Sequence, residues 1–295
     1  MRVKAFETTE PLPSLTEPHA IAMMRPWVDV GSVGTTVLSR LERYLKASEL
    51  AKLAEPGRFF DFTRYRPMLR YANGERQVTI PNTFVNYSQA EGLPDLLFVH
   101  LLEPHSLGEE YIESVLELFK EVGVTRYLLV GGMYDVVPHT RPLRISGSLR
   151  MRGIDEGLAE RFRVKKSTYE GPTSILYMIS RKAQEIGLET GNLTVHLPQY
   201  VQLEEDLSGA AAVLAVLSEL YGLPQELQAR EKAARQYVEL GKTVARNPEL
   251  GALVQRLESM YDARAEEEKE PDDAPPLSPQ VERFLLDIDE RFSNN

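Results

Sequence analysis

The sequence contains no cysteine among its 295 residues, which excludes disulfide bonds, thiolate nucleophiles and cysteine-ligated metal centres. Its five histidines show neither HxxH nor HExxH spacing, so we expect no metal site and no cofactor. It has no run of about 18 apolar residues and begins with no basic-then-apolar leader, so we expect neither a membrane partner nor secretion. These absences favour a cytoplasmic protein.

Positive charge is also scarce. The chain has 34 Lys and Arg against 44 Asp and Glu, giving a formal net charge of −10. Binding to a phosphate backbone depends on clustered cations, so we expect no nucleic-acid partner. One basic cluster departs from this balance, and we interpret it as a solvated face or, alternatively, a small anion-binding patch: Arg144, Arg150, Arg152, Arg161, Arg163, Lys165 and Lys166.

What the sequence does contain is an alternation of short β-rich runs and amphipathic helices. Residues 95–102 and 126–130 read as buried strands, and between them lies a helical stripe that Gly123 ends. Ser106 and Glu109 have the spacing of a capping box at the start of that helix. A strand, a crossover helix and a second strand predict a parallel, right-handed unit.

The same alternation continues on both sides of this unit. Residues 27–30 read as a strand that enters a helix, and residues 171–187 read as a second helix followed by a strand at 193–197. Asp206 or Ser208 should cap an apolar helix that ends at Gly222. The pattern predicts an α/β fold, with helices in layers on both faces of a mostly parallel sheet.

Other segments give further predictions. We expect an irregular arm over the first 20 residues, a half-buried strand over 59–65 and a hairpin that returns through 77–80. We divide the chain into an α/β core, a helical extension broken at Asn247-Pro248, an acidic proline-rich linker and an amphipathic helix: 1–224, 225–262, 263–276 and 277–292. The apolar stripes at 250–261 and 281–292 need cover, which favours a homo-oligomer.

Candidate ligand-binding residues follow from the expected sheet. Ligands of open α/β sheets collect at the carboxyl ends of the strands, where the loops after 27–30, 126–130 and 193–197 should meet. The candidates are Gly31, Ser32, Gly34, His139, Arg141, His196 and Tyr200.

Each candidate also has a purely structural alternative. The glycines can serve close strand–helix packing, because the loop lacks GxGxxG and P-loop patterns. Arg141 can pair with an acidic residue, and His196 can be a hydrogen-bonded structural histidine. Pro138 and Pro142 stiffen the loop around His139 and should hold it extended. Asp29 and Asp135, both near strand ends, remain open as a carboxylate pair.

Six segments, in this order, resemble the proteasome assembly chaperone 2 family and in particular its prokaryotic branch: PWVDVGSVGTTVLSRLERYL, FFDFTRYRPML, LLEPH, GGMYDVVPHTRP, YEGPTSILYMI and VHLPQYV with the following LSGAAAVLAVLSELYGLP. The resemblance implies an α/β sandwich similar to nucleoside phosphorylases. It also implies, for eukaryotic and some archaeal members, a role as chaperones of proteasome α-ring assembly, whereas the function of bacterial members is largely unestablished.

Two hypotheses follow. The first is a non-enzymatic, assembly-chaperone-like or protein-interaction protein that self-associates, which fits the absence of a complete catalytic motif such as GxSxG. The second is a protein or enzyme that binds a nucleoside- or phosphate-like ligand in the crevice at the strand ends. We favour the first.

Overall fold

A computed structural model describes residues 1–295 except 73, 150, 155, 167–170, 172 and 268–295. Its centre consists of four parallel strands that are neighbours in one sheet: β8 (Leu96–Leu102), β3 (His19–Arg25), β9 (Arg126–Asp135) and β12 (Glu189–Pro198). Every residue of β8 is buried, as is typical of a parallel strand covered on both faces. The α/β fold and the parallel relation of residues 95–102 and 126–130 are confirmed, with β3 inserted between them.

The strands outside this centre make the sheet mixed rather than mostly parallel. Beyond β8 the sheet continues antiparallel through β7 (Phe84–Ser88), β4 (Ser48–Leu53), β2 (Phe6–Thr8) and β1 (Arg2–Val3). On the other side β10 (Ile145–Ser148) runs antiparallel to β12, and β11 (Val164–Lys165) runs parallel to β10. The prediction of a mostly parallel sheet is therefore confirmed for the four central strands only, because it rested on the helix-linked strands and missed β4, β7 and β10.

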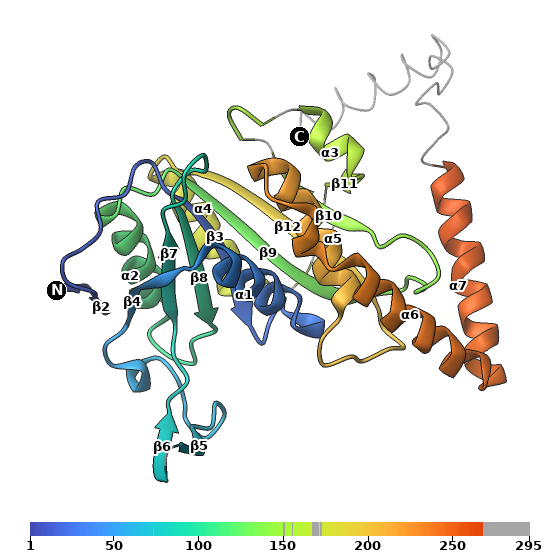
Figure 1. Ribbon diagram of the computed structural model, residues 1–295, viewed down its shortest axis with the longest axis horizontal. Coiled ribbons are helices and arrows are strands. Elements are labelled where there is room, and N and C mark those ends of the chain that lie inside the picture. Colours follow the sequence, from blue (N-terminus) through green and yellow to red (C-terminus); the bar gives the residue numbers. More distant parts are fainter. Residues whose placement is uncertain (73, 150, 155, 167–170, 172, 268–295) are drawn as a thin grey trace, which may run out of the picture.

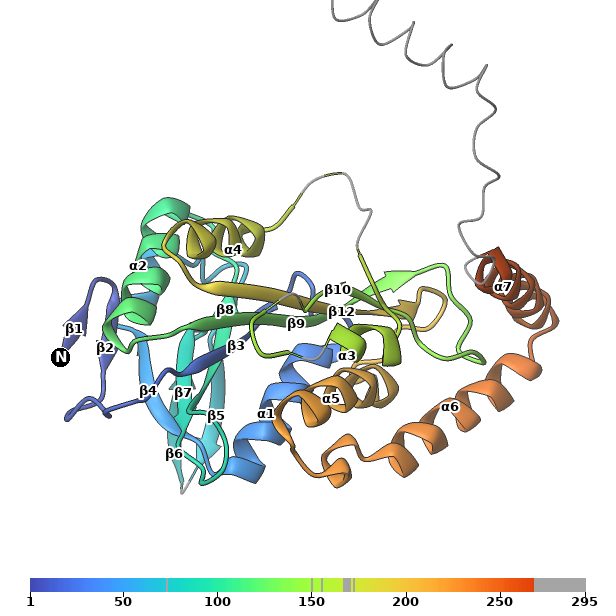
Figure 2. The ribbon, with the colours of Figure 1, turned by 90° about the horizontal axis from the view of Figure 1, so that it is seen from above.

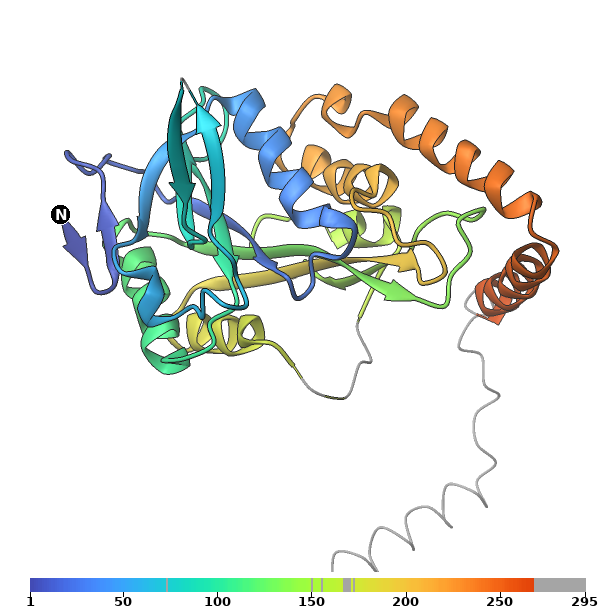
Figure 3. The ribbon, with the colours of Figure 1, turned by 90° about the horizontal axis from the view of Figure 1, so that it is seen from below.

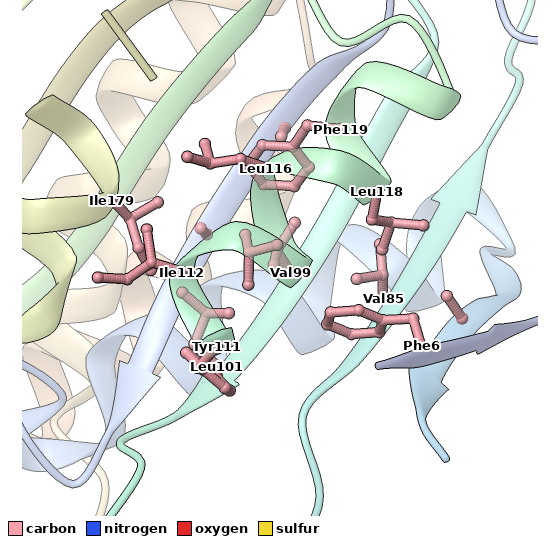
Figure 4. Packing of buried hydrophobic residues seen from close by; sticks show 14 of the residues in the cluster. Phe6, Val85, Val99, Leu101, Tyr111, Ile112, Leu116, Leu118, Phe119 and Ile179 are labelled. Carbon is pink, nitrogen blue, oxygen red and sulfur yellow. The ribbon is translucent and has the colours of Figure 1, made fainter. Parts of the chain in front are cut away.

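Helices cover both faces of the sheet and make three layers (Figure 2). One face carries α2 (Gly108–Glu121) and α4 (Ile175–Glu185), and the other carries α1 (Val33–Leu45) and α5 (Leu207–Tyr221). On the first face Leu116 and Phe119 of α2 lie in the same apolar cluster as Val99 of β8 (Figure 4). Two apolar clusters, one on each face, thus hold the central strands. The comparison with nucleoside phosphorylases stays a prediction.

Several local predictions were wrong. Residues 27–30 form no regular strand: β3 ends at Arg25, and Asp29 makes only an isolated bridge to Gly132 before the short 3-10 helix η1 (Val30–Ser32). The strand in this part of the chain is β3, which lies earlier. The irregular arm expected over the first 20 residues was also wrong, because these residues include β1, β2 and the start of β3. Residues 59–65 form turns rather than a strand, because Phe59 and Phe60 follow a 3-10 turn and are both buried in the core.

Helix ends met the predictions at some positions and not at others. Asp206 caps α5 by accepting the Gly209 N–H at 2.8 Å, and Gly222 ends that helix in a left-handed conformation. The capping box at Ser106 was wrong: Leu107 occupies the cap position with φ 53°, and Ser106 Oγ instead donates to the Arg58 carbonyl. The start of the helix predicted from residue 171 lies at Ile175.

Two appendages project from the sandwich. The hairpin β5 (Met68–Ala72) and β6 (Glu75–Thr79) stands clear of the main sheet (Figure 1). It confirms a returning strand near residues 77–80, but the partner of that strand is 68–72 and not the expected strand at 59–65. A short helix, α3 (Glu156–Arg161), lies near β11.

At the end opposite the N-terminus, α6 (Arg230–Ala245) leads into α7 (Pro248–Glu267) (Figures 1 and 3). The predicted break is confirmed, since Asn247 Oδ1 accepts the backbone N–H groups of Glu249 and Leu250. Helix α7 continues five residues past 262, into the segment assigned to the linker. The remainder of that segment and the helix predicted at 277–292 lie outside the described residues. Among the described helices none is both long and apolar enough to cross a bilayer.

Candidate functional site

The three predicted loops do meet at the carboxyl ends of β9 and β12. The segment after β3 crosses β9 where that strand has its two glycines: Gly132 donates its N–H to the Val28 carbonyl at 2.9 Å. A Cβ on Gly131 would lie 2.1 Å from the same carbonyl oxygen, so only glycine permits this crossing. On the other side the Gln199 N–H donates to the Asp135 carbonyl at 3.1 Å.

The loop with Gly31, Ser32 and Gly34 is filled by the protein itself. The Gly31 carbonyl accepts the Asp206 N–H at 2.8 Å, and Ser32 Oγ donates to the Glu204 carbonyl at 2.7 Å. A Cβ on Gly34 would lie 2.7 Å from the Met23 Cβ. The geometry matches the close-packing alternative for these glycines.

A carboxylate already occupies the N-terminus of α1. Asp29 Oδ1 accepts the Thr35 N–H at 3.1 Å, and Oδ2 accepts the Thr35 hydroxyl at 2.6 Å. Burial raises the pKa of Asp29, and the Thr35 bonds oppose that rise. The Asp29 carboxylate takes the position that an anion would occupy at a helix N-terminus. As for the carboxylate pair left open in the sequence, Asp29 is hydrogen-bonded to Thr35, whereas Asp135 is hydrogen-bonded to His196.

His139 and Tyr200 are joined to each other. The Tyr200 hydroxyl lies 2.6 Å from His139 Nδ1 and accepts the His139 backbone N–H at 2.8 Å. The His139 ring also packs edge-on against Tyr237 of α6. The residue is only 7% exposed, and burial lowers the pKa of its imidazole. This pair connects the proline-bounded loop to the loop after β12.

Arg141 binds α7. Its guanidinium donates from Nε and Nη2 to the two oxygens of Asp262 at 2.9 and 2.7 Å, and from Nη1 to Glu258 at 3.1 Å. The carboxylates raise the pKa of Arg141, whose bonds lower the pKa of Asp262. Tyr261 completes the contact by donating its hydroxyl to the Pro142 carbonyl at 2.8 Å. Sequence reasoning left open an acidic partner for Arg141, but could not name it, since Asp262 lies 121 positions away.

His196 lies at the centre of a polar row that crosses three strands. Its Nδ1 is 2.7 Å from Asp135 Oδ2 on β9, and its Nε2 is 2.8 Å from Ser146 Oγ on β10. The hydrogen bond from His196 holds the pKa of Asp135 below its ordinary value. Sequence reasoning missed Ser146 altogether, because only the antiparallel register of β10 and β12 brings it beside the histidine.

The polar row opens into a cavity of about 680 Å³ whose lining includes His196, Asp135 and Ser146. Tyr261 of α7 and Ala212 of α5 form other parts of the wall. Six cationic side chains also line it: Arg144, Arg161, Arg163, Lys165, Lys166 and Arg264. Five of these belong to the basic cluster noted in the sequence. Of the other two, Arg152 is exposed and pairs with Glu189, and Arg150 lies outside the described residues. No set of three or more potential metal ligands occurs within the described parts of the chain.

Fold and site together define an α/β protein that gathers polar and cationic side chains at the carboxyl ends of parallel strands. The model of the PAC2 family matches residues 23–242, and the chain belongs to that family. A search of curated proteins found no match.

Solved structures of similar fold come from several organisms. A PAC2 family protein of Streptomyces avermitilis is 26% identical, with a TM-score of 0.69 over 80% of this chain and 99% of that one. A protein of unknown function from Corynebacterium glutamicum is 19% identical, with a TM-score of 0.77 over 90% and 99% of the two chains. A proteasome-assembly chaperone homologue of Mycobacterium tuberculosis is 21% identical, with a TM-score of 0.68 over 80% and 99%.

Proposed function

We propose that this chain is an assembly-chaperone-like protein-interaction protein that self-associates. Membership of the PAC2 family supports this role, as does the fold shared with the proteasome-assembly chaperone homologue of Mycobacterium tuberculosis. The observation that carries the proposal is the apolar surface of the β5–β6 hairpin.

One face of the hairpin carries three large apolar side chains and one arginine. Leu69 lies directly opposite Val78, and Tyr71 lies opposite Arg76, so all four leave the ribbon on the same side. Leu69, Tyr71 and Val78 are 53, 67 and 59% exposed. Arg76 lies over the Tyr71 ring, with its guanidinium carbon 5.6 Å from the ring centre. A two-stranded ribbon is marginally stable by itself, so an exposed apolar face on one calls for a partner.

The partner we propose is the same hairpin of a second copy, packed face to face around a two-fold axis. Such an interface is self-complementary, because each apolar face covers the other. The stripe on α7 is a poorer candidate than the sequence indicated, since Val254 and Leu257 are already buried in the chain.

A cysteine cross-link tests this geometry, because the native chain has no cysteine to interfere. In the packing we propose, the two-fold axis passes beside Val78, so Val78→Cys should form a disulfide-linked dimer under mild oxidation, because only a residue at the axis meets its own copy. Met260→Cys, which places a cysteine at an exposed site on α7, is the matched control and should remain single-chain. Equal, background-level cross-linking of the two variants would overturn the hairpin interface.

The cation-lined cavity supports a second candidate, binding of a small phosphate-like anion. Thermal unfolding with inorganic phosphate and with nucleotides tests it: a ligand at 100 times its dissociation constant stabilises the folded state by about 2.7 kcal/mol. The double variant Arg163→Gln, Lys165→Gln should lose that shift, and Arg152→Gln, an exposed cation outside the cavity, should keep it. No shift with any of these anions would exclude this candidate.

A further inference from the structure

We infer that Ser146, His196 and Asp135 form a hydrolytic site for esters that carry negative charge. The inference goes beyond the interaction role, and its substrate class rests on the second candidate function, anion binding in the same cavity. It departs from the non-enzymatic hypothesis, which relied in part on the absence of a complete catalytic motif such as GxSxG.

The sheet itself assembles the three residues. His196 pairs with Met133 on β9, so Asp135, two residues further along, leaves the same face of the sheet. On the other side Ser146 pairs with Thr194, two residues before His196, and again lies on that face. Side chains on three adjacent strands thus form a continuous chain of hydrogen bonds at 2.7 and 2.8 Å.

The chemistry of the three side chains fixes the direction of these hydrogen bonds. The Asp135 carboxylate accepts from the Val136 N–H at 2.7 Å through Oδ1 and from His196 through Oδ2. An ionised carboxylate only accepts, so Nδ1 of His196 carries the proton and Nε2 is left to accept from the Ser146 hydroxyl. That is the arrangement of nucleophile, general base and positioning residue used in acyl transfer.

The cavity supplies access and positive charge. Ser146 is partly exposed and lines the cavity wall. Lys165 pairs with Ser146 in the β10–β11 register, which places its side chain on the same face as the hydroxyl. The ammonium can stabilise the oxyanion that forms during attack. The other lining cations attract a substrate that carries phosphate or carboxylate.

In the reaction, Ser146 Oγ forms a bond to the ester carbonyl carbon while its proton passes to His196 Nε2. The tetrahedral adduct collapses, the carbon–oxygen bond to the leaving group breaks, and the leaving alkoxide takes the proton from Nε2. Water then attacks the acyl-enzyme and gives its proton to Nε2. Ser146 departs with that proton, so the products are a carboxylic acid and an alcohol, with no change of oxidation state.

A fluorophosphonate probe tests the nucleophile on the full-length protein, with the modified residue identified by mass spectrometry. We expect labelling at Ser146 that is lost in Ser146→Ala and kept in Ser148→Ala, a serine on the same face of the same strand. Asp135→Asn keeps the shape but favours the wrong tautomer, so labelling should slow by up to about 10⁴-fold with little change in the unfolding temperature. No labelling of folded wild type overturns the inference, as does equal labelling of Asp135→Asn.

Two esters test the substrate class. The anionic 4-nitrophenyl hemisuccinate should show a higher kcat/KM than neutral 4-nitrophenyl acetate, and Arg163→Gln with Lys165→Gln should abolish that preference. Equal rates for both esters in the wild type would overturn the substrate class. A thermal shift with phosphate but no labelling of Ser146 would leave the binding candidate in place and remove the hydrolytic site. Labelling of Ser146 without a phosphate shift would leave the hydrolytic site in place and remove the binding candidate.

Discussion

Arg141 and Asp262 form a bidentate ion pair in which two parallel N–H groups meet two carboxylate oxygens at 2.9 and 2.7 Å. The pair joins the loop bounded by Pro138 and Pro142 to helix α7. Because both prolines fix their own φ, the loop is held in shape to receive the helix. Arg141, which the sequence offered as an anion ligand, thus binds a carboxylate of its own chain.

Loss of this pair should release α7 without unfolding the core. Arg141→Gln removes both the fork geometry and the charge, so we expect limited proteolysis within residues 248–267 to accelerate severalfold while the unfolding temperature of the core stays unchanged. Arg256→Gln removes a charge from an exposed position of α7 and should leave the cleavage rate as in the wild type. Unchanged proteolysis of Arg141→Gln would mean that other contacts hold the helix.

His19 should make stability depend on pH. Burial, and next the nearby Arg126 guanidinium, lower the pKa of His19 from 6.5 to about 4, while Glu189 acts in the opposite direction. The unfolded chain therefore binds a proton between these two values that the folded chain does not, so the contribution of His19 to stability rises with pH across this window and is constant above it. One pKa unit corresponds to about 1.4 kcal/mol, and partial exposure of the ring reduces the effect to about 1–2 kcal/mol.

The measurement for His19 is denaturant unfolding at pH 4.5 and pH 7 for the wild type and for His19→Gln. The variant lacks the titrating ring, so its loss of stability on acidification should be smaller by that amount. The difference between the two proteins also cancels the titration of carboxylates they share. Parallel pH curves for the two proteins would contradict a lowered pKa at this position.

Local signals in the sequence predicted part of the local structure and failed at the Ser106 cap and at residues 59–65. Contacts across the sheet escaped them. The caps at Asp206, Gly222 and Asn247 were predicted because each depends on a few neighbouring residues. The insertion of β3 between β8 and β9 and the antiparallel pairing of β10 depend on packing between distant segments. For that reason His196 was identified as a candidate but its partner Ser146 was not.

The crossing of β9 by the segment after β3 makes Gly131 sensitive to any side chain. A Cβ there would lie 2.1 Å from the Val28 carbonyl oxygen, and backbone cannot move aside cheaply. Gly131→Ala should destabilise the protein by about 1–3 kcal/mol. Gly251→Ala in α7, where a Cβ would meet nothing within 4 Å, should instead raise the helicity of α7. Chemical denaturation of both variants checks the contrast, and a neutral Gly131→Ala would contradict the close crossing.

Asp206 joins two helices through its two oxygens. Oδ1 caps α5 through the Gly209 N–H, and Oδ2 accepts the Tyr237 hydroxyl of α6 at 2.9 Å. Burial raises the pKa of this carboxyl, and the two bonds offset part of that cost. Asp206→Ala should lose about 1–2 kcal/mol from the cap plus the bond to α6, whereas Tyr237→Phe should lose only about 1 kcal/mol. Equal losses in equilibrium unfolding would show that the cap contributes nothing.

The central claim is that two copies of this chain associate through the apolar faces of their β5–β6 hairpins. Light scattering during size-exclusion chromatography, over a range of protein concentrations, tests it most directly. The claim predicts a mass of two chains, about 67 kDa from 33.4 kDa each, that falls to one chain when Leu69→Ser and Val78→Ser are combined. A wild-type mass of one chain at every concentration, or a mass that the double variant leaves unchanged, would contradict it.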